Sequence, residues 1–142
     1  MSGALQADIR NLARFRYALR RFLHSSEEGA REAGLTPQHH QLLLGIAGFT
    51  PKGWATVSEL SEFLQVRHHS VVGLIDRAEE LDLVRREVNP DDRREVRIVL
   101  TPTGTRKLRT LETLHRRELA GMRRMVSLRV DGTGTGRSRK RA

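Results

Sequence analysis

The sequence predicts a mainly helical fold with one small β-hairpin, and three observations support this. Stretches at both ends of the chain repeat apolar residues every three or four positions, which is the period of a helix. Two shorter helical stretches separated by a tight turn lie between them. Directly after these, the apolar pattern changes to a period of two, which is typical of strands. A chain of 142 residues is long enough to form one domain with its own core.

The first predicted helix covers residues 4–31. Gly34 is suited to end it, because glycine readily adopts the left-handed backbone that follows many helices. Thr36 then predicts an N-cap, with Pro37 at the first position of a second helix of about three turns. The apolar stripe of the first helix consists of Leu5, Ile9, Leu12, Phe15, Leu19 and Phe22.

A loop rich in turn residues at 49–54 leads into the most informative part of the chain. A short helix begins within residues 56–60, with Ser58 as its predicted N-cap, and ends near Leu64. Residues 65–67 form a tight turn, and a longer helix follows from about His68 to Leu81. The predicted apolar face of this helix is Val71, Leu74, Ile75, Ala78 and Leu81. Two short helices joined by a tight turn indicate a helix-turn-helix.

Residues 84–88 and 96–100 are predicted to be two strands. Between them, residues 89–92 read Asn-Pro-Asp-Asp and predict a turn with the proline at its second position. The tip of the hairpin therefore displays Asp92, Arg93 and Arg94. A helix-turn-helix followed by such a hairpin is a winged helix.

Thr101 and Pro102 predict the start of a last helix that continues to about Leu128. Its apolar stripe is Leu108, Leu111, Leu114, Met122, Met125 and Val126. The stripes at the two ends of the chain are longer than the central lobe can cover, so we expect them to pack together and against a second copy. The alternative is a helical pair within a monomer.

The predicted organisation is therefore dimerisation helices at 1–34 and 102–129, a winged helix-turn-helix lobe at 35–101, and a disordered basic tail at 130–142. The tail is rich in Gly, Thr, Ser and basic residues. It either adds non-specific phosphate contacts or is a passive end.

The charge balance favours an anionic partner. Lys and Arg number 26 and Asp and Glu 17, which gives a net charge of +9. For a basic domain, double-stranded DNA or another nucleic acid is the first candidate partner. The chain has no cysteine, which excludes disulfides, thiolate zinc sites and cysteine nucleophiles. We expect no membrane span and no secretory signal, and the cytoplasm is the default compartment.

The second helix of the helix-turn-helix is polarised. Its basic and imidazole side chains gather at the N-terminus, while its acidic side chains lie toward the C-terminus. A helix that enters a major groove by its N-terminus needs this order, because cations and free N–H groups then face phosphates and base edges. Val72 and Gly73 are expected nearest the groove floor. The predicted contacts from this part of the chain are Arg67, His68, His69, Ser70, Val72, Gly73 and Arg77.

The hairpin tip is the second predicted DNA contact. Arg93 or Arg94 would meet the negative potential of a narrow minor groove. Asp92 is predicted to pair with Arg94 and hold its guanidinium in place. Alone, a mixed-charge turn is usually only a solvated surface. Attached to a helix-turn-helix, it favours DNA binding.

The motifs that carry a family resemblance are Gly34-Leu35-Thr36-Pro37, Ser58-Glu59-Leu60, residues 66–84, and Asp92-Arg93-Arg94 leading to Leu100-Thr101-Pro102-Thr103-Gly104. Together with the order of the elements, they resemble the multiple antibiotic resistance regulator (MarR) family of bacterial transcription factors.

This resemblance implies a homodimer that binds a pseudo-palindromic site, usually as a repressor, often released by a small aromatic or acidic effector. Arg94 matches the minor-groove arginine of the family, and Asp92 matches its partner. Val72-Gly73 departs from the pattern of Ser or Thr followed by a bulky polar residue that many members have. This difference bears on which operator sequence the helix recognises, and not on whether the helix enters the major groove.

Side chains suited to an effector pocket are scattered along the chain. Five candidates combine polar or aromatic character with a predicted place near the dimer helices or the lobe, although ordinary packing or exposure is the alternative for each. They are Arg16, Tyr17, His24, His40 and Trp54.

No metal site, cofactor or enzymatic activity is predicted. His39 and His40 are adjacent and point about 100° apart on a helix, so they do not face one ion easily. No catalytic Ser-His-acid set or carboxylate pair stands in a recognisable context. The alternative function is a winged-helix protein–protein interaction module without specific DNA binding. The basic hairpin tip and the polarised helix favour DNA.

Overall fold

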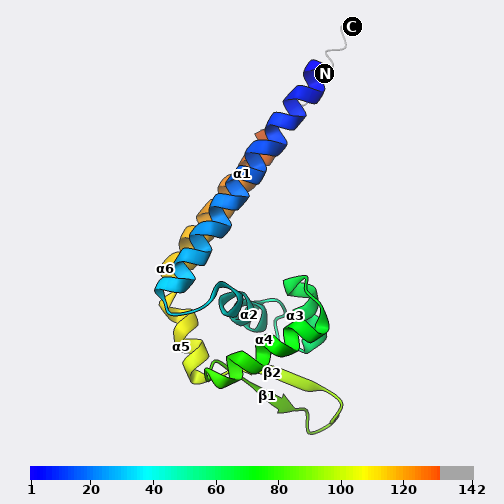
Figure 1. The fold of residues 1–142 in the computed structure, drawn as a ribbon, viewed down its shortest axis with the longest axis vertical. Helices are drawn as coiled ribbons and strands as arrows, with labels where there is room; N and C mark the ends of the chain where they lie inside the picture. Colours follow the sequence, from blue (N-terminus) through cyan, green and yellow to red (C-terminus); the bar gives the residue numbers. More distant parts are fainter. Residues whose placement is uncertain (132–142) are drawn as a thin grey trace, which may run out of the picture. The chain divides into compact units, whose positions relative to one another are not determined.

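The computed structural model describes residues 1–131, with side chains through residue 125 (Figure 1). It confirms the predicted mainly helical fold with one antiparallel hairpin. The elements are α1 (Gly3–Glu32), α2 (Pro37–Gly48), α3 (Val57–Leu64), α4 (His68–Glu80), β1 (Val84–Val88), β2 (Val96–Leu100), α5 (Pro102–Thr110) and α6 (Glu112–Asp131). Residues 132–142 of the predicted basic tail lie outside the described residues, while residues 130 and 131 belong to α6.

The chain forms two compact units. Glu27–Thr113 form one, and Met1–Ser26 form the other together with the residues from Leu114 onward. The divisions fall inside α1 and α6, at 26/27 and 113/114, where the sequence predicted 34/35 and 101/102. We call them the central unit and the terminal unit. Among the described residues, no helix combines the length and the apolar character needed to cross a membrane.

The core of the central unit lies where α2, α3 and α4 pack on one another and on the hairpin (Figure 1). Register in the hairpin runs from Val84 opposite Leu100 to Val88 opposite Val96. Ala55 adds one further rung, because its backbone exchanges hydrogen bonds of 3.1 and 2.8 Å with Ile98. The fully buried side chains include Leu42, Leu43, Ile46, Leu60, Val71, Ile75 and Ile98.

Two predicted boundaries are confirmed by their hydrogen bonds. Gly34 has a φ of +77° at the end of α1, and the N–H groups of Gly34 and Leu35 donate back into the last turn, to Arg31 and Ala30 at 3.0 and 2.9 Å. At the start of α2, the Thr36 hydroxyl accepts from the backbone of His39 at 3.0 Å. These hydrogen bonds fix where α1 ends and where α2 begins.

The predicted N-cap of α3 is wrong by two residues. Thr56, not Ser58, caps the helix. The Thr56 hydroxyl accepts from the Glu59 backbone at 3.2 Å, and the Glu59 carboxylate accepts from the Thr56 backbone at 3.2 Å. A carboxylate three residues after the cap completes this reciprocal arrangement, and Glu59 has that spacing from Thr56.

The single long helix predicted after Pro102 is also wrong, because it is broken at Leu111 into α5 and α6. The Thr110 hydroxyl donates to the Lys107 carbonyl at 2.6 Å. In a continuous helix the Leu111 N–H would donate to that carbonyl, but it turns to Leu108 at 3.2 Å instead. The tighter turn ends α5 and places Leu111 in the core, where it is buried.

Leu81 does not belong to the apolar face of α4, since it is 57% exposed. The helix ends at Glu80, and Asp82 takes a left-handed φ of 57°. The Leu83 N–H then donates to Ala78 at 2.9 Å, which brings Leu83 into the core in place of Leu81.

The hairpin tip also differs from the predicted turn at 89–92. The Asn89 side chain accepts from the Asp91 backbone at 3.0 Å, forming a local turn across Pro90. The backbone turn lies later, where the Glu95 N–H donates to Asp92 at 3.0 Å. The tip is therefore closed by two successive turns.

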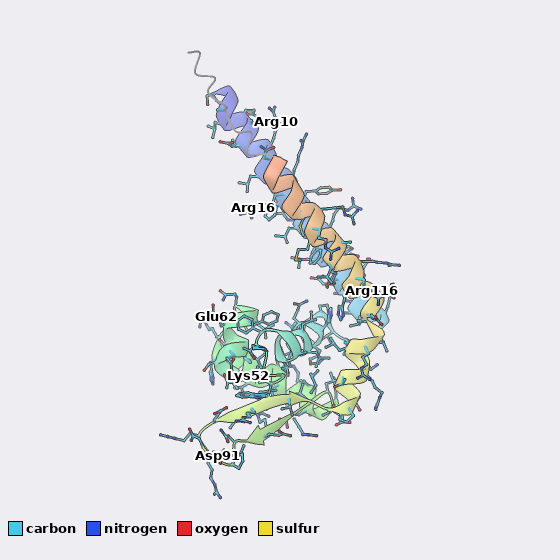
Figure 2. The ribbon with its side chains drawn as sticks, turned by 180° about the vertical axis from the view of Figure 1, so that it is seen from behind. Arg10, Arg16, Lys52, Glu62, Asp91 and Arg116 are labelled. Atoms are coloured by element: carbon cyan, nitrogen blue, oxygen red, sulfur yellow. The ribbon has the colours of Figure 1, made fainter. Side chains whose placement is uncertain are left out.

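In the terminal unit, the first part of α1 lies beside α6, and both views agree on this (Figures 1 and 2). A Cβ placed on Gly121 would lie 3.4 Å from the Phe22 ring, so the two helices approach closely at this point. The predicted stripe of α1 remains substantially exposed: Leu5, Ile9, Leu12 and Phe15 are between 42 and 55% exposed.

Candidate nucleic-acid interface

The N-terminus of α4 is open to solvent. Its N-cap is Arg67, which makes no side-chain capping hydrogen bond, so no cap side chain occupies the N–H groups of the first turn. Arg67, His68, His69 and Ser70 are all exposed. An uncapped helix N-terminus surrounded by exposed basic side chains is suited to bind an anion.

Farther along α4, the predicted contact residues differ in how far they are exposed to solvent. Val72 and Gly73 are half-buried, and Arg77 is exposed. A Cβ placed on Gly73 would meet only the Arg77 guanidinium, at 3.5 Å. The glycine therefore leaves room on this side of the helix for a partner to approach.

Arg77 also influences the buried side chain of His39. Desolvation by burial and, second, the positive charge of Arg77 lower the pKa of His39. His39 is only 6% exposed, and its Nε2 is buried without a hydrogen-bond partner among the described residues. Burial and the charge of Arg77 therefore favour the neutral form of His39.

Two of the three acidic side chains of α4 are engaged by the hairpin. Arg86 on β1 contacts Asp76 at 2.7 Å and also pairs with Glu79. Sequence reasoning missed this bridge, because Asp76 and Arg86 are ten residues apart and belong to different elements. The only signal in the sequence was that Asp76 and Glu79 are three residues apart, which places both carboxylates on one side of the helix.

At the hairpin tip, the structure confirms the predicted contact between Asp92 and Arg94. The Asp92 carboxylate accepts from the Arg94 backbone at 3.1 Å and from its Nε at 3.2 Å. The Arg94 side chain is otherwise 93% exposed, and Arg93 is exposed as well. Figure 2 shows the neighbouring Asp91 at the free end of the hairpin. The tip therefore presents two arginines to solvent, one of them held by a carboxylate.

Trp54 forms a second contact between the helix-turn-helix and the hairpin. Lys52 Nζ lies 3.9 Å and Arg97 Cζ 4.3 Å from the centre of its ring. Lys52 also pairs with Glu59 of α3 at 2.8 Å, and Arg97 with Glu95 at 3.2 Å. These contacts were not predicted, since they depend on how the loop before α3 crosses β2.

A family model described as MarR family matches residues 33–95, which contain α2, α3, α4 and the hairpin through its tip. This part of the chain is similar to the MarR family. This confirms the resemblance carried by the motifs of the sequence. The family consists of winged-helix DNA-binding transcription regulators.

Solved structures with the same fold agree with this assignment. A MarR family protein from Bacillus stearothermophilus is 25% identical, with a TM-score of 0.68 over 86% of this chain and 81% of that one. AbsC, a MarR family transcriptional regulator from Streptomyces coelicolor, is 24% identical, with a TM-score of 0.66 over 88% and 80%. MepR from S. aureus, in complex with DNA, is 18% identical, with a TM-score of 0.63 over 76% and 78%. No curated protein matches the chain.

The residues proposed for an effector pocket do not form one group. Tyr17 lines a hollow of about 500 Å³ in the terminal unit, whereas Arg16, labelled in Figure 2, and His24 are not among its lining residues. In the central unit, His40 is fully buried and Trp54 lies against Lys52 and Arg97. Among the described residues, no three His, Asp or Glu side chains are grouped as metal ligands.

Proposed function

We propose that this chain is a sequence-specific regulator that binds double-stranded DNA as a homodimer on a pseudo-palindromic operator and acts as a repressor. The observation that carries the proposal is the pairing of two cationic surfaces in the central unit. One is the open N-terminus of α4 with Arg67, His68 and His69, and the other is the hairpin tip with Arg93 and Arg94.

The distribution of charge favours DNA over a protein partner. Exposed arginines such as Arg67 and Arg93 attract phosphates, and Arg94 remains 93% exposed beside Asp92. Two of the acidic side chains that would oppose this on α4, Asp76 and Glu79, share the positive charge of Arg86, which offsets part of their negative charge. A helix for the major groove and a hairpin for the minor groove provide the two contacts that a winged helix makes with a duplex. MepR, whose structure contains DNA, has this fold.

The homodimer is supported by the apolar surface of the terminal unit. Leu5, Ile9, Leu12 and Phe15 follow one stripe of α1, and Leu119 and Met122 of α6 are also about half exposed. A continuous apolar stripe of this length favours association. A two-fold dimer would present two recognition helices roughly 34 Å apart, one turn of DNA.

Fluorescence anisotropy tests DNA binding directly. The full chain is titrated onto the duplex that flanks its own gene and onto a scrambled duplex, over a range of salt concentrations. We expect nanomolar binding to the first duplex, about 10³-fold tighter than to the second. Equal binding to both, with a steep salt dependence that disappears when the residues after Asp131 are removed, would contradict specific binding by the winged helix.

We further propose that an aromatic acid is the effector and that the hollow in the terminal unit binds it. Arg21, Arg117 and Arg124 line the hollow beside the rings of Tyr17 and Phe22. Glu118 also lines it, and its Oε1 is buried without a hydrogen-bond partner among the described residues. Such an oxygen accepts from a hydroxyl or amine, so a hydroxylated aromatic carboxylate matches the lining chemically.

The effector proposal is tested on the protein–DNA complex. A hydroxybenzoate should release the duplex, whereas the corresponding uncharged amide should not. Arg124→Met should abolish the response, and Arg10→Met, which removes the same charge from an exposed position outside the lining, should not. Equal responses of the two variants would exclude this hollow as the site.

A further inference from the structure

Arg86 joins the hairpin to the recognition helix. Its two terminal nitrogens separate: Nη2 contacts Asp76 at 2.7 Å, while Nη1 contacts Glu79. Asp76 and Glu79 are three residues apart on α4, so one planar guanidinium spans both carboxylates on the same side of the helix. The contact holds two elements together through charge-assisted hydrogen bonds, which are the stronger kind.

Among the described residues, Arg86 makes the contact of β1 with α4 that lies nearest the tip, while Arg97, opposite Glu87 on β2, contacts Trp54. Val84, Arg86 and Val88 lie on the same face of the strand because side chains alternate. Val84 is 2% exposed and is held in the core, whereas Val88 is 56% exposed. On this face of β1, Arg86 is therefore the last side chain that contacts α4, and Val88 beyond it faces solvent.

A small change at Arg86 has a large effect at the tip. Asp91 is the fifth residue after Arg86, at an extended distance of at most ~17 Å for a rise of ~3.3 Å per residue. A rotation of ~10° about Arg86 would move the tip by ~3 Å, which is the length of a hydrogen bond. Arg94 and α4 can reach one duplex together only if this angle is held.

We propose that Arg86 is a positioning residue that sets the angle between the wing and α4 and thereby makes the Arg94 contact with DNA available. The inference rests on the proposed function. It also gives a structural role to Asp76 and Glu79 of α4, since both carboxylates pair with Arg86. The sequence had indicated only that these acidic residues lie away from the DNA.

A double-mutant cycle tests this on the full chain. The probe is the duplex recovered from a random-sequence library by selection with the wild-type protein, and affinity is measured by anisotropy. In the wild-type background, Arg94→Ala should weaken binding about tenfold. In the Arg86→Met background, which itself binds more weakly, Arg94→Ala should cost less than about twofold, because the wing is no longer held in place.

Arg85→Met is the matched control. Arg85 is the neighbouring residue on β1, and it pairs with Glu87 of the same strand at 2.8 Å rather than with α4. The control loses the same charge, but Arg94→Ala should still weaken binding about tenfold in its background. If Arg94→Ala costs the same in the Arg86→Met and Arg85→Met backgrounds, Arg86 does not position the wing.

A second variant separates positioning from simple neutralisation and covers the case in which Arg86→Met fails to fold. Asp76→Asn combined with Glu79→Gln removes two negative charges, which by electrostatics alone would strengthen DNA binding. The inference predicts that the Arg94 contribution is lost here as well. A persistent tenfold effect of Arg94→Ala would overturn the inference while leaving the proposed function intact. If the wild-type chain selects no duplex, both fail.

Discussion

Two glycines of the central unit have very different surroundings. A Cβ on Gly104, in the first turn of α5, would lie 2.0 Å from the Leu83 carbonyl oxygen, which is backbone and cannot move aside. A Cβ on Gly73, in α4, would meet only the end of the flexible Arg77 side chain at 3.5 Å. The first glycine is required by packing, while the second is permitted by an open surface.

We therefore expect opposite effects from the same substitution at these positions. Gly104→Ala should lower the free energy of unfolding by about 3 kcal/mol, because α5 must shift away from Leu83. Gly73→Ala should raise it by roughly 0.5–1 kcal/mol, because alanine is the better helix former. If Gly73 faces the groove floor, the same Gly73→Ala variant should bind its duplex more weakly. Urea denaturation and anisotropy measure the two effects, and unchanged stability of Gly104→Ala would contradict the packing argument.

His39 gives a prediction about pH. Burial and Arg77 lower its pKa in the folded state below the ordinary value of 6.5, so the unfolded chain takes up a proton first as the pH falls. The free energy of unfolding should therefore decrease as the pH drops below about 6.5, and it should be unaffected by His39 above that value.

The measurement is urea denaturation at several pH values for the wild type, His39→Gln and His69→Gln. His69 is the matched control, since it is exposed on the surface of α4. The slope of stability against pH should become flatter in His39→Gln and should persist in His69→Gln. The same slope in all three proteins would show that His39 is not the titrating group.

Contacts at the residue scale were predictable only where the sequence neighbourhood decides them. Asp92 and Arg94 are two residues apart on a tight turn, so their pairing follows from local geometry. The bridge from Arg86 to Asp76 and the contact of Trp54 with Arg97 depend on how separate elements cross. A helical or strand period carries no information about that crossing.

At the scale of elements, the N-cap of α3 is Thr56 in the structure, whereas the sequence pattern predicted Ser58. Thr56→Ala removes the hydroxyl that accepts from Glu59 and should cost about 1 kcal/mol of unfolding free energy. Ser58→Ala, at the position favoured by the sequence, should change stability by less than ~0.5 kcal/mol, because Ser58 is exposed and does not cap the helix. Equal losses in thermal or urea denaturation would contradict the assignment of the cap.

The strands and the α5–α6 break show what an apolar pattern can and cannot predict. Both strands have the predicted bounds, since alternation and a proline-containing turn limit them on each side. The break at Leu111 was invisible, because Leu108, Leu111 and Leu114 continue a helical spacing across it. At the break, the Thr110 hydroxyl donates to the Lys107 carbonyl, which the Leu111 N–H would use in a continuous helix.

At the scale of the whole molecule, several apolar residues of the terminal unit remain exposed to solvent in the single chain. The half-exposed residues of α1 follow the stripe that the sequence predicted for dimerisation. Transfer of that stripe out of water would stabilise a dimer by ~25 cal/mol for each Å² buried. A dimer held together by this surface would bind two half-sites on DNA.

The double substitution Leu12→Asp and Phe15→Asp tests this link. It places two charges in the stripe, so the chain should elute as a monomer in size-exclusion chromatography with light scattering. Arg14→Asp is the matched control, because position 14 lies on the opposite side of α1 and is exposed. Its mass should equal that of the wild-type dimer.

The monomeric variant should also lose affinity for the full operator far more than for a half-site, since each lobe then binds alone. A wild-type chain that is already monomeric at micromolar concentration would refute the dimer, and with it the expectation of a pseudo-palindromic site.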